Sequence, residues 1–183
     1  MNRFAIAITP PHRPTRLALA LLLATGLLVA CGDKQDATAL APFEIGRDTA
    51  CELDGMLLAD YPGPKGQILY AGEEAPDFFC DTTELLSTLL AGEQVRAVRA
   101  AYAQDMAKAD WSQPQGYWID AKTAVYVVGS KRHGSMGPTI ASFAEETDAQ
   151  QFSQEYGGKV LRFAEISKDM VDLRGGALHD SHM

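Results

Sequence analysis

Hydrophobic and polar residues follow each other along this chain in a succession that occurs twice. In the first succession, the β-prone run 66–70 is followed by Asp81, a residue suited to cap a helix, with Glu84 three positions later. Four leucines then fall on one helical face: Leu85, Leu86, Leu89 and Leu90. Gly92 ends this helix, and the alternation over 95–102 predicts a further strand.

The second succession repeats this order. Runs rich in β-branched and apolar residues over 123–128 and 140–143 predict two strands. The stretch 147–150 (Thr-Asp-Ala-Gln) fits a capping box at a helix start, an apolar stripe follows, and two glycines end the helix before a strand over 160–163. Since one such unit is marginal alone, we predict an α+β fold in which two small strand-strand-helix-strand modules pack together.

The segments around these modules complete the predicted domain organisation. Between the modules, Pro114 and Gly116 mark a connector that carries a tryptophan at each end. The tail after residue 167 is polar and contains a Gly pair, which predicts a flexible end. The expected segments are a signal peptide over 1–30, a lipidated tether over 31–47, a first ββαβ module over 48–110, a connector over 111–118, a second ββαβ module over 119–167 and a flexible tail over 168–183.

The amino-terminal segment resembles a bacterial lipoprotein signal. Three arginines precede an almost wholly apolar run over 17–30, which is too short to span a bilayer. The run ends in Leu-Val-Ala-Cys at 28–31, which is similar to the lipobox of bacterial lipoproteins. That resemblance implies cleavage before Cys31 and lipidation of its thiol, and therefore a periplasmic, lipid-anchored protein, with the inner or outer membrane left open. Plain secretion and an uncleaved anchor are the alternatives.

The charge and the histidine positions exclude several function classes. The net charge is −8, and removal of the signal segment would take away three arginines and no acid, which argues against nucleic-acid binding. The sequence contains no phosphate-binding Gly-rich loop and no zinc-hydrolase pattern. Of its four histidines, only His133 lies in the predicted modules. We therefore expect no enzymatic activity.

The cysteines and two methionines offer soft metal ligands. With Cys31 lipidated, two of the three cysteines remain, Cys51 and Cys80. A disulfide between them is one alternative. However, the aromatic neighbours of Cys80 suggest burial, whereas the polar approach to a turn around Cys51 suggests access. Met56 and Met136 each lie beside Gly and near Pro, where a methionine has no obvious core to fill. Thiolate and thioether favour Cu(I).

Several of these elements together resemble the NosL family of nitrous oxide reductase accessory lipoproteins. They are Cys-Glu-Leu-Asp-Gly-Met at 51–56, Tyr-Pro-Gly-Pro-Lys-Gly-Gln at 61–67, Val-Gly-Ser at 128–130, Met-Gly-Pro at 136–138 and Gly-Gly-Lys-Val at 157–160. The resemblance covers roughly residues 48–167 and implies two homologous strand-strand-helix-strand modules, similar to the fold of the organomercurial lyase.

The resemblance also implies a function, a cargo and partners. It implies a periplasmic Cu(I) metallochaperone that supplies copper for nitrous oxide reductase maturation. The implied partners are the periplasmic side of an ABC transporter complex and, through it, the reductase. Where family members often carry a second Cys, this chain has Asp54, which makes Cys51 the expected sole thiolate. We predict Cys51 and Met136 as the principal ligands, followed by Met56 and His133. The rival hypothesis is a non-metal periplasmic binding module with a Cys51–Cys80 disulfide.

Overall fold

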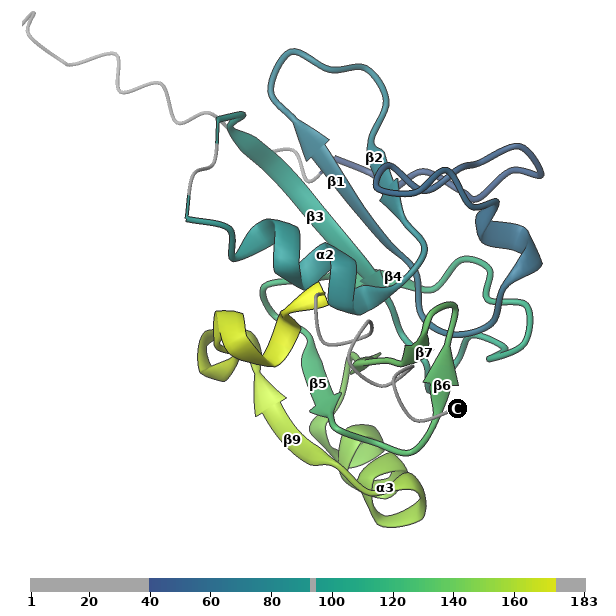
Figure 1. Cartoon of the computed structure of the whole chain (residues 1–183), viewed down its shortest axis with the longest axis vertical. Coiled ribbons are helices and arrows are strands. Elements are labelled where there is room, and N and C mark those ends of the chain that lie inside the picture. The colour runs from purple at the N-terminus through teal and green to yellow at the C-terminus, as the bar shows by residue number, and fades with distance from the viewer. Residues whose placement is uncertain (1–39, 93–94, 174–183) are drawn as a thin grey trace, which may run out of the picture. The chain divides into compact units, whose positions relative to one another are not determined.

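The first module is built on a four-stranded antiparallel sheet. The structure is a computed structural model that describes residues 40–92 and 95–173. Strand β1 (Gly66–Tyr70) lies between β2 (Asp77–Phe79) and β3 (Val98–Gln104), and β4 (Trp118–Asp120) pairs with the far side of β3. Helix α2 (Thr82–Leu89) packs against this sheet (Figure 1). The predicted strand at 66–70 and the helix capped by Asp81 are confirmed.

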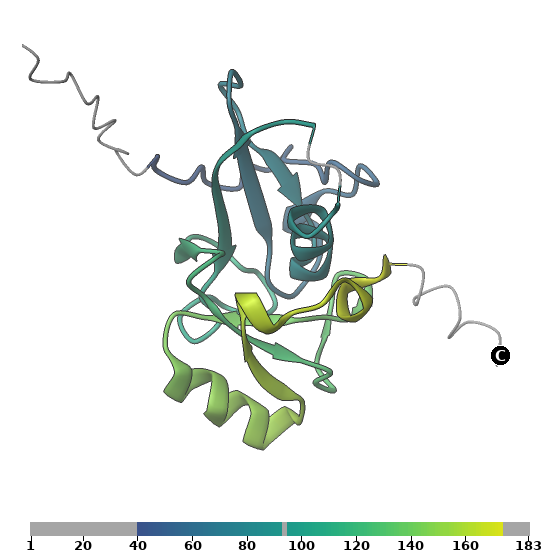
Figure 2. The ribbon, with the colours of Figure 1, turned by 90° about the vertical axis from the view of Figure 1, so that its left-hand side faces the viewer.

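The second module has a three-stranded antiparallel sheet with its own helix. Strand β5 (Val125–Val128) is central, flanked by β8 (Ala141–Phe143) and β9 (Lys159–Arg162). Helix α3 (Glu146–Tyr156) packs against the sheet beside β8 and β9. The strand, strand, helix, strand order is therefore present in both modules, and the predicted α+β class is confirmed (Figure 2).

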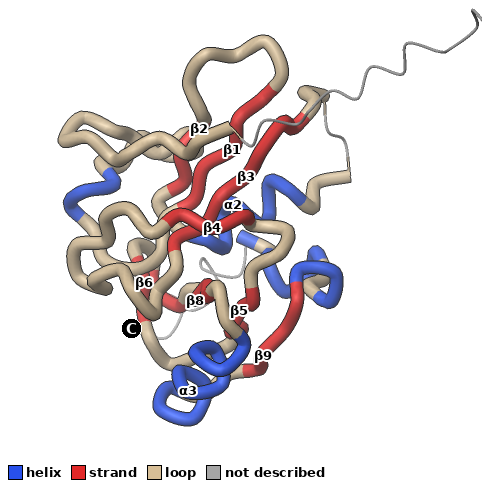
Figure 3. The backbone as a smooth tube through the Cα atoms, turned by 180° about the vertical axis from the view of Figure 1, so that it is seen from behind, coloured by secondary structure: helices blue, strands red, loops and turns tan. Residues whose placement is uncertain are grey.

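Short elements join and border the two modules. A two-stranded hairpin inserted between β5 and β8 carries Ser135 and Met136 at its turn. The stretch before β1 runs beside β2, to which it is tied by the bond from the Glu52 amide to the Phe78 carbonyl (Figure 3). The remaining elements are η1 (Leu58–Asp60), β6 (His133–Gly134), β7 (Gly137–Pro138), η2 (Phe163–Glu165) and η3 (Lys168–Val171).

Leu86 joins the two modules into one shared core. It lies on α2 of the first module but is fully buried in a cluster that contains Tyr126 and Leu161 of the second module. Val171 of η3 closes the same cluster. Because burial of a large apolar side chain contributes about 1.5–3 kcal/mol, this shared cluster stabilises the packing of one module on the other.

Three predicted boundaries need correction. The tail was expected to be flexible from 168, but η3 forms and Val171 is only 1% exposed, because it fills the cluster under α2. The tether was expected to extend to 47, but the Phe43 backbone exchanges two hydrogen bonds with the Gln67 amide, and Ile45 is buried. The connector is predicted to end at Trp118 and the second module to begin at 119, but Trp118–Asp120 form β4, because their backbone pairs with β3 of the first module.

The start of α3 also differs from the prediction. The sequence predicts a capping box that begins at Thr147, whereas the N-cap is Glu145 and Thr147 lies within the first turn. The reason is tertiary: β8 ends at Phe143, so the chain turns into the helix two residues earlier than the Thr-x-x-Gln pattern indicates.

The predicted signal peptide and Cys31 lie outside the described residues, as does the end of the tail from 174. Within residues 40–92 and 95–173, no helix has the length and hydrophobicity needed to cross a membrane.

Candidate metal site

Helix α2 places two potential ligands at its amino-terminal end. Cys80 comes directly after β2, and Asp81 caps the helix by accepting a hydrogen bond from the Thr83 amide at 2.8 Å. Glu84 lies in the first turn, four residues after Cys80, so their side chains lie on the same side of the helix start. The Cys80 Sγ donates to Glu84 Oε2 at 3.4 Å.

A tight turn brings Cys51 to the same carboxylate. The Cys51 amide donates to the Met56 carbonyl at 2.8 Å, and the Gly55 amide donates back to the Cys51 carbonyl at 2.9 Å. Asp54, within the turn, accepts from the Met56 amide at 2.9 Å. The turn leaves its polar residues in solvent and directs Cys51 inward, where its Sγ donates to Glu84 Oε2 at 3.2 Å.

These residues form a compact cluster of two thiols and two carboxylates. One ligand atom each from Cys51, Asp54, Cys80 and Glu84 lies within 4.8 Å of the others. Cys51, Cys80 and Glu84 are buried, and Asp54 is exposed at the edge. Both cysteines are free, so the disulfide of the rival hypothesis is not formed. Two sulfur and two oxygen donors suit soft and borderline metal ions.

Burial holds both thiols in their protonated form. It raises the pKa of Cys51, against the lowering effect of hydrogen bonds from the backbone of Cys80 and Leu53. For Cys80, burial is again the main cause of a raised pKa, and the nearby Glu84 charge adds to it. Because a metal binds the thiolate form, a bound ion has to displace these protons.

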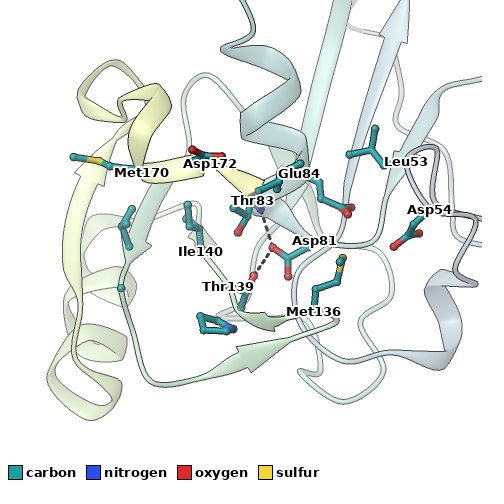
Figure 4. A pocket seen from close by; sticks show the side chains of 14 residues that line it. Leu53, Asp54, Asp81, Thr83, Glu84, Met136, Thr139, Ile140, Met170 and Asp172 are labelled. Carbon is teal, nitrogen blue, oxygen red and sulfur yellow. Dashed lines mark hydrogen bonds between the residues drawn. The ribbon is translucent and has the colours of Figure 1, made fainter. Parts of the chain in front are cut away.

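A pocket of about 500 Å³ opens beside the cluster and receives Met136. Figure 4 shows the Met136 side chain rising from the β6–β7 hairpin into a space bounded by Asp54, Asp81 and Glu84. Met136 is 58% exposed, so its thioether remains open to solvent and to other molecules. Met170 lines the other end of the pocket and points away from Met136 (Figure 4).

The buried Lys65 fastens this hairpin onto the helix start. Its Nζ donates to the Cys80 carbonyl at 3.0 Å, the Pro62 carbonyl at 2.9 Å and the Ser135 hydroxyl at 2.6 Å. Ser135 in turn donates to the Cys80 carbonyl at 2.5 Å. Burial lowers the pKa of Lys65 to about 8, although the nearby carboxyl groups of Asp81 and Glu84 oppose that shift. The lysine and the serine thereby set the position of the neighbouring Met136.

The Pro-Gly-Pro-Lys sequence also permits a close backbone contact. Gly63 has a φ of 83°, and a Cβ at this position would lie 2.6 Å from the Gly134 Cα. Only glycine fits both the positive φ and the contact. This turn therefore allows the hairpin to approach the first module closely enough to bring Met136 to the pocket.

The four predicted ligands lie in different places: in the cluster or the adjoining pocket, in an apolar core, or on the surface. Cys51 lies in the cluster, and Met136 lines the adjoining pocket. Met56 is half-buried and packs against the apolar cluster around Cys51, so it does have a core to fill, contrary to our expectation. The His133 side chain is exposed and belongs neither to the cluster nor to the pocket lining, and its carbonyl accepts a bond from the Trp111 indole.

The accessibility expected of Cys51 is wrong, and the predicted ligands do not include Cys80 and Glu84, which lie in the candidate cluster. Cys51 is only 4% exposed, because the turn packs it under Ile45 and Leu58. The burial expected of Cys80 is confirmed. The spacing of Cys80 and Glu84 in the sequence indicates that they lie close together. A cysteine just before a helix cap and an acid four residues later share one side of the helix start.

Comparisons with known proteins point to one family. The family model described as NosL matches residues 42–171. The chain is 39% identical over 168 residues to the copper-binding lipoprotein NosL of Stutzerimonas stutzeri, covering 88% of this chain and 87% of that protein. It is 39% identical over 163 residues to the protein of the same name from Achromobacter cycloclastes, covering 86% and 83%. The crystal structure of the copper chaperone NosL from Shewanella denitrificans superposes with a TM-score of 0.66 at 40% identity, covering 71% of this chain and 97% of that one.

Proposed function

This chain belongs to the NosL family, and from that premise we propose that it is a membrane-anchored copper-binding protein that holds Cu(I) and passes it to a partner. The relatives are called copper-binding lipoprotein and copper chaperone, which supports a carrier role rather than catalysis.

The observation that carries the proposal is the convergence of soft donors from both modules. Cys51 lies in the thiol cluster of the first module, and the Met136 thioether of the second module lines the adjoining pocket. A thiolate compensates the charge of the cation. A thioether needs no deprotonation and disfavours hard divalent ions, so the combination selects Cu(I).

The different exposure of these donors suits uptake and transfer. Cys51 is buried, so it shields a bound ion from water, whereas Met136 is exposed at the pocket mouth. A ligand of a partner protein can replace the thioether first and then take over the ion from the thiolate. Such stepwise exchange lets the ion move without being released as a free cation.

The location and the partner belong to the same proposal. We place the protein in the periplasm, anchored through a lipid on Cys31, which is consistent with the word lipoprotein in the names of both relatives. The recipient is the periplasmic side of an ABC transporter complex for nitrous oxide reductase maturation, and the reductase receives the copper through it. The acidic chain favours a recipient with a basic surface.

A Cu(I) competition assay tests the proposal. The reduced full chain, in detergent micelles, is mixed with one equivalent of Cu(I) and a colorimetric Cu(I) chelator. The parent should withdraw copper from the chelator, C51A should lose most of this capacity, and M136A should weaken it. M170A is the matched control, since Met170 lines the same pocket but points away from Met136 (Figure 4). Failure of the parent to compete, or parent-like competition by both C51A and M136A, would overturn the proposal.

A further inference from the structure

We propose that Cys80 is a second thiolate ligand and that Cu(I) is bound between the sulfur atoms of Cys51 and Cys80. This inference rests on the proposed copper function and deepens it. It replaces the single-thiolate site predicted from the sequence, in which Asp54 stands where a second cysteine was expected.

The metal-free protein holds the two thiols on one carboxylate oxygen. Both Sγ atoms donate to the same oxygen, Glu84 Oε2, at 3.2 Å from Cys51 and 3.4 Å from Cys80. The two sulfurs are thus directed at one point although they come from different elements. One ligand atom each from Cys51 and Cys80 lies within 4.8 Å of the other. An ion that replaces the two thiol protons can therefore lie between the sulfurs, beside the Glu84 carboxylate that now accepts both protons.

The groups around the two sulfur atoms favour negative charge on them. The Cys80 amide donates to Cys51 Sγ at 3.4 Å, which favours the thiolate form of Cys51. Cys80 precedes the N-cap of the eight-residue helix α2, where the helix dipole stabilises negative charge. The buried Lys65 ammonium is bonded to the Cys80 carbonyl. These groups offset part of the negative charge of two thiolates on a monovalent ion.

The protein shields the two sulfur atoms of the cluster from solvent. Cys80 is 0% and Cys51 4% exposed, whereas Met136 is 58% exposed. Two buried thiolates can retain Cu(I) while the exposed thioether meets the partner. In this arrangement binding replaces two S–H bonds with two Cu–S bonds, and both protons pass to the solvent.

Affinity measurements on cysteine variants test the second thiolate. Every variant is the full chain in detergent with C31S, so that Cys51 and Cys80 are the only thiols. We expect C80S to weaken Cu(I) binding at least about 100-fold, beyond the 10–100-fold typical of residues that only support a ligand. M106L, which alters a buried sulfur in the core of the second module, should bind like the parent. Parent-like affinity of C80S would overturn the inference.

A sulfur count by X-ray absorption gives a second measurement that leaves Cys80 intact. The variant C31S/M56L/M136A lacks the two candidate thioethers, so sulfur atoms bound to copper in it report the thiolates. Two sulfurs support the inference, and one sulfur overturns it. The proposed copper function fails separately, if the parent does not bind Cu(I) at all. If the parent binds Cu(I) and C51S loses it while C80S does not, only the second thiolate is lost.

Discussion

The helix starts of the two modules have the same order of residue types, but the acidic residues are buried at the start of α2 and the N-cap is exposed at the start of α3. Phe79, Cys80 and Asp81 lead into α2, and Phe143, Ala144 and Glu145 lead into α3: in each case a buried Phe, one linking residue and the N-cap. An acid follows at the third helical position, Glu84 in α2 and Asp148 in α3. Asp81 and Glu84 are buried, whereas Glu145 is exposed and makes no capping bond.

The difference comes from what covers each helix start. The β6–β7 hairpin lies over the start of α2, where Ser135 bonds the Cys80 carbonyl and the Thr139 hydroxyl donates to Asp81 at 2.7 Å. At α3, Glu146 forms an exposed ion pair with Arg162 instead. The repeat therefore supplies the scaffold twice, but only the start of α2 carries a cysteine and receives Cys51 beside it. The hairpin adds Met136 to the adjoining pocket, so this start is the candidate metal site.

The largest expected effect comes from removing the buried phenylalanine before each helix. F79A and F143A should each lower the free energy of unfolding by about 3–5 kcal/mol, since both side chains are almost wholly buried. Denaturant titration of the metal-free chain measures this. F79A should also weaken Cu(I) binding, because Phe79 fixes the position of Cys80. If F143A weakened Cu(I) binding of the folded protein equally, the two helix starts would not differ in function.

The next effect is the pH dependence that the buried Asp81 gives to the free energy of unfolding between pH 4 and 6. Burial raises its pKa from 3.8 to about 6. The folded metal-free protein then holds this proton more tightly than the unfolded chain. The stability that Asp81 contributes is therefore fully present below about pH 4 and is lost as the pH rises through 6. The loss is about 3 kcal/mol, at 1.4 kcal/mol for each pKa unit.

Chemical denaturation at a series of pH values measures this fall in the metal-free protein. D81N should flatten the curve between pH 4 and 6. E145Q, at the corresponding position of α3, should leave the curve unchanged because Glu145 is exposed. An unchanged slope in D81N would assign the pH dependence to another group.

A smaller effect on stability and Cu(I) affinity is expected when the β6–β7 hairpin loses the Ser135 hydroxyl. S135A leaves the Cys80 carbonyl with one donor fewer and removes a partner of Lys65. We expect a loss of about 1–2 kcal/mol of stability and about a 10-fold weaker Cu(I) affinity, because Met136 is no longer held in place. The control is S153A, which removes an exposed bond to the Gly158 carbonyl at the end of α3. Equal Cu(I) affinities for S135A and the parent would contradict a positioning role.

The smallest effect is expected from a substitution that makes the start of α3 more like the start of α2. Since Glu145 makes no side-chain cap, E145D supplies the shorter carboxylate that caps α2 at Asp81. We expect a gain of about 0.5–1 kcal/mol, measured as a higher melting temperature. A lower melting temperature would show that Glu145 has a stabilising contact of another kind.

Local sequence patterns predicted most of the scaffold but misplaced some boundaries. The run 66–70 and the Asp81 cap were found because strand alternation and capping are local properties. The cap of α3 was misplaced at Thr147, since Thr-x-x-Gln satisfies the same pattern and only the end of β8 selects Glu145. The folded part of the tail was missed because the burial of Val171 depends on a cluster from distant segments.

The sequence by itself determined the two modules and the supply of soft donors, since backbone preferences and ligand chemistry are properties of single residues and short runs. Only the tertiary structure decided which donors meet. It turned Cys51 inward, placed Cys80 beside the same Glu84 oxygen and left His133 outside the cluster and the pocket. The physical reason is that side-chain convergence depends on the geometry of a turn, on the end of a strand and on the docking of a hairpin, and each of these is set by contacts between residues far apart in the chain.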